Sequence, residues 1–407
     1  MTTSVHEPPP PAPAVLPGTA GALLHAYRPG EHRFLATPRR TLLGAGTAAE
    51  VPHGTAPLGE RVRSVLAEQT AHRHRTGGAE GPGPAPLVMG AVPFDRDAPA
   101  ALAVPRTVRR APALREDPAA ALTAGEGAPH RWQVREVPSA AVYREAVAAA
   151  VDRMRAGELD KVVLARTLEL TSATAPDLAA MLRRLARRDP AGYTFAVPAG
   201  PGRTLVGASP ELLVARTGGR LVANPLAGSA PRSADLADDV RRAAALLQSE
   251  KDLHEHAVVV DAVRRALEPL CTRLEVPARP TLVRTAAMWH LSTTVTGELA
   301  DPAATALDLA SALHPTPAVC GTPTAVAREV IAASEPFDRG AYTGMVGWQD
   351  AHGDGEWVVT IRCAEAEGNR LRLFAGAGVV AASSPQAETD ETAAKFRTFL
   401  DAVGAAL

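Results

Sequence analysis

Two pairs of acidic residues lie far apart in the sequence but share a spacing that could bind a metal ion. Asp252 and Glu255 form one pair, and Glu388 and Glu391 form the other. Each pair lies in a stretch whose apolar pattern predicts a helix, so its two carboxylates are about one turn apart on one face. Carboxylate oxygens are the ligands that Mg²⁺ prefers. For either pair alone, the simpler interpretation is a solvated helix face.

Two further residues have types and places suited to acid and base chemistry. Lys161 begins a predicted strand rich in leucine and β-branched residues, and Glu211 lies at a Ser-Pro-Glu corner between two predicted strands. Burial lowers the pKa of a lysine and raises that of a glutamate, which moves them toward use as a base and an acid. The alternatives are a lysine at an exposed strand end and a solvated glutamate in a turn.

A charged residue also interrupts an apolar segment near the C-terminus. Arg362 lies in the middle of EWVVTIRCAEA, which predicts one strand with Arg362, Thr360 and Ala364 on one face. A charged residue in a central strand needs a partner. That partner is either the carboxylate of an anionic ligand or a structural salt bridge.

The sequence argues against a zinc site. His254 and His256 flank Glu255, but alternating side chains on a helix point in different directions, and no HExxH spacing is present. The three cysteines are far apart and lack CxxC spacing, which also argues against a disulfide framework. We expect buried structural thiols.

Composition excludes several classes of protein. The chain has 407 residues, of which 46% are hydrophobic, enough for a sizeable core. Its 43 basic and 44 acidic residues give a net charge of −1, so no overall field favours nucleic acid or an anionic membrane. Prolines 8 to 11 stand where a signal peptide needs an apolar core, and no apolar run reaches the ~18 residues of a membrane span. We therefore expect a cytoplasmic protein without a nucleic-acid or membrane partner.

The hydrophobic patterns predict antiparallel strands with long helices among them, which is an α+β fold. Strands are predicted in 33–46 (a hairpin), 87–95, 161–170, 203–227 (three strands), 293–299 and 342–380 (a three-stranded meander). Helices are predicted over 59–71, 140–156, 178–188, 236–270 (broken), 303–313 and from residue 385 onward. The segment 72–86 and the proline-containing segment 314–321 are predicted loops.

Several of these segments, in this order, closely resemble the chorismate-binding enzymes. They are ELDKVVLAR, ASPELL, NPLAGSAPR, SEKDLHEH, MWHLSTTV, HPTPAVCG, EPFDR, GEWVVTIRC, FAGAG and ETDETAAK. The resemblance implies one α+β unit of two packed antiparallel β-sheets with helices on the outside. The proline-rich composition of segment 1–17 predicts a disordered tail. The resemblance divides the rest into a weakly family-like N-terminal part of the fold (18–135) and the chorismate-binding catalytic region (136–407).

Within that family the segments are most similar to isochorismate synthases of the 2,3-dihydroxybenzoate siderophore type. The similarity implies Mg²⁺-dependent isomerisation of chorismate to isochorismate. Lys161 would be the base that activates water for attack at C2, and Glu211 the acid that protonates the departing C4 hydroxyl. Glu255 and Glu391 would ligate Mg²⁺, with Asp252 and Glu388 acting directly or through water. The substrate carboxylates would be held by Gly228, Ser229, Arg362, Gly376 and Lys395, and the pocket lined by His290 and Ala318.

Departures from sister enzymes narrow the expected activity. Aminodeoxychorismate synthases resemble this chain but carry a lysine at the position of Ala227, and anthranilate synthases carry glutamine at that of Lys161. We therefore expect no amination and no glutamine amidotransferase subunit, and we expect a monomer. Relatives often have glutamate in place of Asp252. The aspartate side chain is shorter, which argues against direct ligation of the metal ion by Asp252. A salicylate synthase, which also eliminates pyruvate, and a catalytically inactive chorismate-binding protein are the alternatives.

Overall fold

Two large antiparallel sheets form the body of the protein in a computed structural model that describes residues 18–76, 84–118, 120 and 131–403. The predicted tail 1–17 lies outside these residues. The first sheet has the order β18-β8-β22-β21-β10-β9-β1-β2-β6, with β7 also paired to β8. Its strands are β1 (His32–Ala36), β2 (Thr41–Ala45), β6 (Thr107–Ala111), β7 (Gln133–Val137), β8 (Lys161–Thr171), β9 (Tyr193–Pro198), β10 (Arg203–Ser209), β18 (Gly321–Thr322), β21 (Cys363–Glu367) and β22 (Arg370–Val380).

The second sheet has the order β14-β17-β12-β11-β20-β19-β4-β5-β3. Its strands are β3 (Ala49–Glu50), β4 (Leu87–Val92), β5 (Ala101–Val104), β11 (Leu212–Thr217), β12 (Arg220–Asn224), β14 (Cys271–Glu275), β17 (Val295–Leu299), β19 (Met345–Asp350) and β20 (Gly355–Val359). A small third sheet joins β13 (Leu226–Pro231), β16 (Met288–Ser292) and β15 (Thr281–Arg284).

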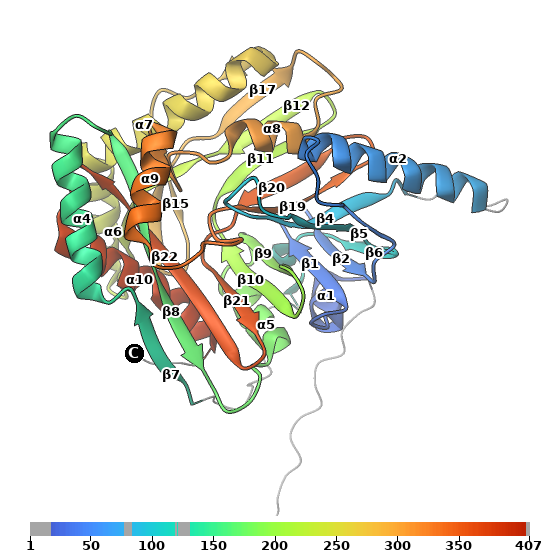
Figure 1. The fold of residues 1–407 in the computed structure, drawn as a ribbon, viewed down its shortest axis with the longest axis horizontal. Coiled ribbons are helices and arrows are strands. Elements are labelled where there is room, and N and C mark those ends of the chain that lie inside the picture. The colour runs from blue at the N-terminus through green and yellow to red at the C-terminus, as the bar shows by residue number, and fades with distance from the viewer. Residues whose placement is uncertain (1–17, 77–83, 119, 121–130, 404–407) are drawn as a thin grey trace, which may run out of the picture.

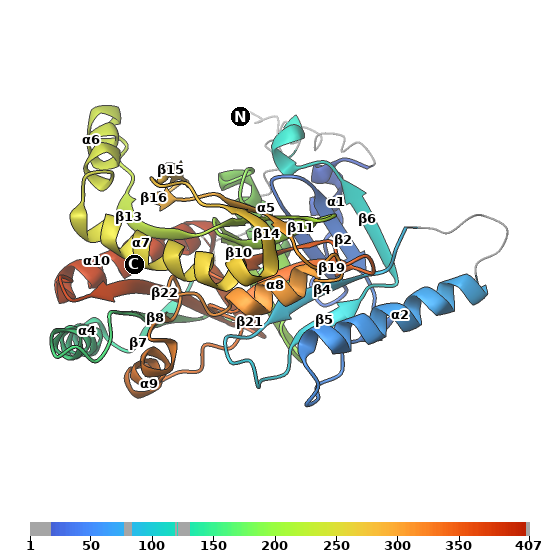
Figure 2. The same cartoon turned by 90° about the horizontal axis from the view of Figure 1, so that it is seen from above.

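Helices lie outside the two large sheets (Figures 1 and 2). They are α1 (Ala20–Ala26), α2 (Leu58–Thr76), α4 (Ala140–Arg155), α5 (Leu178–Arg188), α6 (Leu236–Leu246), α7 (Glu250–Leu267), α8 (Ala306–Leu313), α9 (Thr324–Ser334) and α10 (Pro385–Val403). Helices α1, α4, α5, α9 and α10 pack on the first sheet, α2 and α8 pack on the second, and α7 packs on the third sheet and on α8.

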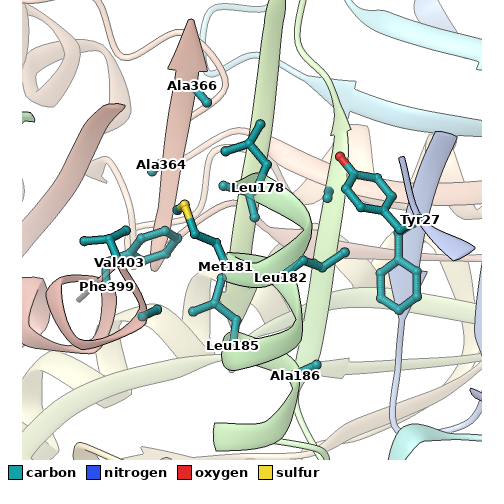
Figure 3. Close-up of a cluster of buried hydrophobic side chains, with 14 of the residues drawn as sticks. Tyr27, Leu178, Met181, Leu182, Leu185, Ala186, Ala364, Ala366, Phe399 and Val403 are labelled. Carbon is teal, nitrogen blue, oxygen red and sulfur yellow. The ribbon is translucent and has the colours of Figure 1, made fainter. Parts of the chain in front are cut away.

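Alternation along the strands gives the molecule separate apolar layers. In β1, Leu35 points into the core between the two sheets, while Phe34 points to the outer face. That outer face is covered by α1, α5 and α10. Tyr27, which follows α1 directly, lies in one buried cluster with Met181 of α5 and Phe399 of α10 (Figure 3). Both faces of the first sheet are therefore buried at β1, as expected for a strand between two packed layers.

The predicted fold class is correct, and several element boundaries need correction. Helix α2 continues to Thr76, so part of the predicted loop 72–86 is helical. Met288–Ser292, which precedes a predicted strand, is itself strand β16. Strands from the N-terminal part of the chain join both large sheets, β1 beside β9 and β4 beside β19. Among the described residues, no helix has the length and apolar character needed to cross a membrane.

Candidate active site

The chain passes between the two large sheets at two neighbouring corners. It leaves the first sheet for the second between β10 and β11, and it returns to the first between β20 and β21. Glu211 lies in one corner and Arg362 in the other. Backbone hydrogen bonds tie the corners to the neighbouring strands. The Ala208 amide donates to the Arg362 carbonyl over 3.0 Å, and the Val359 amide donates to the Glu211 carbonyl over 3.1 Å. An acid and a cation are thus fixed where the two sheets separate.

The prediction of one continuous strand through Arg362 is wrong. Segment EWVVTIRCAEA is divided between β20, which pairs in the second sheet, and β21, which pairs in the first. Arg362 has a φ of +50°, a left-handed conformation that is uncommon for residues other than glycine. The corner turns its buried side chain into a cavity instead of onto a sheet face.

That cavity contains about 680 Å³ of empty space, a volume that includes its opening to solvent. Its walls come from the two corners, β8, β13, β16, β22, α7, α10 and the segment before β18. Most of the predicted site residues line it, namely Glu211, Gly228, Ser229, Glu255, His290, Ala318, Arg362, Gly376, Glu391 and Lys395. The other three do not line the cavity but neighbour residues that do: Lys161 contacts Glu255, Asp252 lies beside Gly228, and Glu388 lies near Glu391.

Lys161 is buried at the start of β8. Its side chain is 0% exposed, and its Nζ lies 2.8 Å from Glu255 Oε1 on α7. Among the described residues this Nζ has no hydrogen-bond acceptor in good geometry, so the contact holds the ammonium mainly by charge. The close approach depends on Gly378, because a Cβ there would lie 2.2 Å from Glu255 Oε1 and 3.1 Å from Lys161 Cε. The interpretation of Lys161 as an exposed strand end is wrong.

Glu211 is buried as well, with 3% of the residue exposed. Burial raises the pKa of its carboxyl from 4.5 to about 7, although the Leu226 amide and the Lys161 charge act in the opposite direction. The amide donates to Glu211 Oε1 over 3.4 Å. A carboxyl with this pKa is protonated in a large fraction of molecules near neutral pH and can give up a proton. The interpretation as a solvated turn glutamate is therefore also wrong.

The two acidic pairs lie on helices, as predicted, and the N-terminal ends of those helices meet. Lys251 of α7 lies 2.7 Å from Glu388 Oε1 of α10. Glu388 is fully buried, and burial together with the neighbouring Glu391 raises its pKa. Burial also raises the pKa of Asp252, whose Oδ2 accepts a hydrogen bond from the Ser249 hydroxyl over 2.5 Å. A solvated helix face does not describe these residues.

Strand β13 joins both helices to the cavity. Ser229 donates a hydrogen bond to Glu391 over 3.1 Å. Gly228 has a φ of +77°, and a Cβ there would lie 3.0 Å from the Cβ of Asp252, so the strand passes close to α7. Lys395 is 2.5 Å from Glu391 and donates to the Gly376 carbonyl over 2.8 Å. Burial alone would raise the pKa of Glu391, but the charges of Lys395 and Lys251 and the hydrogen bonds from Lys395 and Ser229 together outweigh burial and lower that pKa.

The side of the cavity formed by His290 and Arg362 favours an anion. Burial lowers the pKa of Arg362 to about 10, so the guanidinium stays charged at neutral pH. Burial, together with Arg362 and Lys395, lowers the pKa of His290 well below its ordinary value, so its imidazole is neutral. His290 Nε2 is buried without a hydrogen-bond partner in the described part of the chain. Arg362 and Lys395 supply positive charge beside a neutral imidazole that can bond to a ligand.

A sequence profile of the chorismate binding enzyme family matches residues 97–404. The chain belongs to the chorismate-binding enzymes. It is 52% identical over 388 residues to isochorismate synthase DhbC of Bacillus subtilis, and this match covers 94% of this chain and 96% of that protein. It is 42% identical over 376 residues to the vibriobactin-specific isochorismate synthase of Vibrio cholerae, which covers 91% of each chain.

A solved structure from Bacillus anthracis has a similar fold. That protein, DhbC, is provisionally described as a 2,3-dihydroxybenzoate-specific isochorismate synthase. It superposes with a TM-score of 0.86 at 46% sequence identity, covering 95% of this chain and all of that one. The two-sheet architecture predicted from the family resemblance is therefore confirmed.

The resemblance to chorismate-binding enzymes implies that the site binds Mg²⁺, and the chemistry of the predicted ligands fits that ion. The four predicted ligands are carboxylates, and Glu388 Oε2 is buried without a hydrogen-bond partner in the described residues. Across those same residues, no group of three or more Asp, Glu, His or Cys side chains is arranged as a metal site. Instead, Glu255, Glu388 and Glu391 are each paired with a lysine. The acidic cluster is neutralised by the protein's own cations.

Several residues around this cavity were not predicted from the sequence. Lys251 is one, and its signal was available, because lysine is rare in this chain. His256 is another: its ring contacts the Ala227 carbonyl at 3.2 Å and the Thr293 hydroxyl at 2.7 Å, which uses both nitrogens within the protein. These contacts leave neither ring nitrogen of His256 free for a ligand.

The buried pair Glu335 and Arg339 of the EPFDR segment also has a structural role that was not predicted. Arg339 donates to Glu335, to the carbonyls of Val319 and Val163 and to the Thr343 hydroxyl. Glu335 accepts from the Ala165 amide over 2.8 Å. The pair therefore supplies partners for β8 backbone groups beyond β18, and it fixes the cavity wall at Val319 against the strand that begins with Lys161.

Proposed function

We propose that this chorismate-binding enzyme converts chorismate to isochorismate in a Mg²⁺-dependent reaction. The observation that carries the proposal is a cavity lined by Arg362, Lys395 and Glu211, whose buried carboxyl has a raised pKa, with buried Lys161 2.8 Å from the lining residue Glu255. The relatives named isochorismate synthase, at up to 52% identity over most of the chain, support the same assignment.

The reaction requires one base and one acid. Lys161 in its neutral form takes a proton from water as that water bonds to C2 of the ring. The ring double bonds shift, and the C4–O bond breaks as Glu211 protonates the departing hydroxyl. One water is added and one is lost, so the atoms balance. The resulting ammonium of Lys161 and carboxylate of Glu211 return to their starting forms by proton exchange with solvent.

The remaining site residues hold a dianionic substrate. Arg362 and Lys395 lie where they can neutralise a carboxylate, and Ser229, Gly228 and Gly376 form the wall beside them. His290 and Ala318 shape the cavity. Glu255 and Glu391 would hold Mg²⁺, with Asp252 and Glu388 one helical turn before each. When bound, the ion would offset the acidic side chains, which otherwise repel a substrate carboxylate.

The relatives named for vibriobactin and 2,3-dihydroxybenzoate support a place in siderophore biosynthesis. A cytoplasmic location, a monomeric state and the absence of an amidotransferase subunit remain predictions. Sedimentation velocity of the purified protein tests the oligomeric state.

Chromatography of chorismate incubated with the protein, with Mg²⁺ or with a chelator, tests the proposed activity. We expect isochorismate only with Mg²⁺ and no release of pyruvate. Pyruvate release would instead indicate a salicylate synthase. Unchanged chorismate in both samples would indicate an inactive binding protein, a reading that the burial of both Lys161 and Glu211 argues against.

A further inference from the structure

Lysine is almost absent from this chain, and its few occurrences gather in one place. Of the 43 basic residues, three are lysines, Lys161, Lys251 and Lys395, and the rest are arginines. Each lysine is paired with a different carboxylate of the acidic cluster. The Nζ to oxygen distances are 2.8 Å to Glu255, 2.7 Å to Glu388 and 2.5 Å to Glu391. Since arginine provides the positive charge everywhere else, these positions need a property that lysine alone has.

Lysine differs from arginine in how it holds a carboxylate. Its ammonium is a compact point charge on a flexible stem, whereas the planar guanidinium grips two oxygens at once. A lysine can therefore leave its partner with the loss of a single contact. Lys161 and Lys395 have assigned parts in the proposed function, as the base and as a substrate contact. Lys251 has none.

The surroundings of Lys251 indicate what it does. Its partner Glu388 is fully buried, and the second oxygen of that carboxylate, Oε2, has no hydrogen-bond partner in the described residues. Glu391 and Glu255 also lie close enough to act on the Lys251 charge. The Lys251 side chain is 30% exposed, compared with 0% for Lys161 and 17% for Lys395, so it has the most open path to solvent.

We propose that Lys251 is an exchangeable counter-ion of the acidic cluster. Its ammonium neutralises Glu388 while no divalent ion is bound, and it moves out toward solvent when Mg²⁺ binds. The exchange keeps a buried carboxylate compensated in both states, which matters because a buried charge left without a partner is strongly destabilising. This inference rests on the Mg²⁺ dependence proposed above.

Two substitutions of Lys251 change its competition with Mg²⁺ for the acidic cluster in opposite directions. Lys251→Met removes the competing charge, so Mg²⁺ binds more tightly, by about tenfold for one unit charge a few ångströms from the ion. Lys251→Arg keeps the charge and adds a second contact to Glu388, so Mg²⁺ binds more weakly. Arg265→Met is the matched control, because Arg265 pairs with Asp261 on the same helix but is 63% exposed and away from the cluster.

Calorimetric titration with Mg²⁺ alone, without substrate, measures these affinities. The expected order is Lys251→Met tightest, wild type and Arg265→Met equal, and Lys251→Arg weakest. If Lys251→Met binds Mg²⁺ only as tightly as the wild type, or more weakly, the inference is overturned while the proposed function stands. No Mg²⁺ binding to wild type overturns both the metal dependence and the inference.

A second measurement uses the wild-type chain and so does not depend on whether the variants fold. Its amines are the three lysines and the N-terminus, so limited acetylation followed by peptide mass spectrometry reports on each lysine separately. We expect Mg²⁺ to increase the acetylation of Lys251 several-fold while buried Lys161 stays unmodified. If Mg²⁺ leaves the acetylation of Lys251 unchanged or lowers it, the inference is contradicted.

Discussion

Lys161 Nζ lies 2.8 Å from Glu255 Oε1, and this contact joins the first strand residue of β8 to helix α7. It connects the proposed base directly to a proposed metal ligand. Both side chains are buried, so a change in the charge of one acts on the other with little screening by solvent. The contact is also possible only because Gly378 leaves room for it. The proposed base and the proposed cation site are therefore in direct contact in this fold.

Lys161→Ala should lower turnover strongly and leave chorismate binding largely intact. A general base contributes about 10²- to 10⁴-fold to a rate, so kcat should fall within that range. Initial rates of isochorismate formation and calorimetric titration with chorismate measure the two quantities. A kcat equal to that of the wild type would reject Lys161 as the base.

Glu211→Gln should lower kcat, because glutamine has the shape of the acid but no proton to give. In the wild type, kcat should decline as pH rises through about 7, the pKa of the buried carboxyl, since only the protonated form is an acid. A pH–rate profile tests both statements. An activity of Glu211→Gln that matches the wild type, with the same decline, would show that another group is responsible.

The same carboxyl should make folding stability depend on pH. Because burial raises the folded-state pKa from 4.5 to about 7, the folded protein retains a proton that the unfolded chain releases. Its stabilising contribution is complete below about pH 4.5 and is lost as pH rises through about 7. Glu211→Gln removes this dependence, so its stability relative to wild type should increase over that interval. Urea unfolding at several pH values measures the difference, and a constant difference would be inconsistent with a raised pKa.

Glu391→Gln should weaken Mg²⁺ binding by at least about tenfold, because an amide oxygen lacks the charge of a carboxylate. Asp390→Asn is a suitable control, since Asp390 is the exposed neighbour on the same helix and bonds to Gln386. The rise in melting temperature with added Mg²⁺ reports the binding. If both variants respond as the wild type does, Glu391 is not a ligand.

The sequence predicted the helical positions of the acidic residues better than it predicted how those helices pack. Spacing placed Glu388 and Glu391 on one helix face, and α10 confirms it. Burial of Glu388 depends on the packing of α10 on β22 and α4, and its partner Lys251 lies on α7, 137 positions earlier in the chain. No local pattern contains that information.

Arg362 shows a different limit. A run of β-formers predicts a strand equally well whether or not the strand changes sheets midway, because local propensity does not specify pairing partners. The left-handed residue between β20 and β21 has no signal in its side chain, since arginine does not favour that conformation. The family resemblance could identify Arg362 as a site residue, but only the fold shows the corner that holds it beside Glu211.

The most direct test of the account is the origin of the oxygen in the product. Chorismate should be incubated with the protein and Mg²⁺ in water enriched in ¹⁸O, and the recovered isochorismate analysed by mass spectrometry. If Lys161 activates solvent water for attack at C2 while Glu211 expels the C4 hydroxyl, each product molecule contains one ¹⁸O at C2. Isochorismate without ¹⁸O would mean that the hydroxyl migrates within the substrate, which contradicts the roles assigned to both residues.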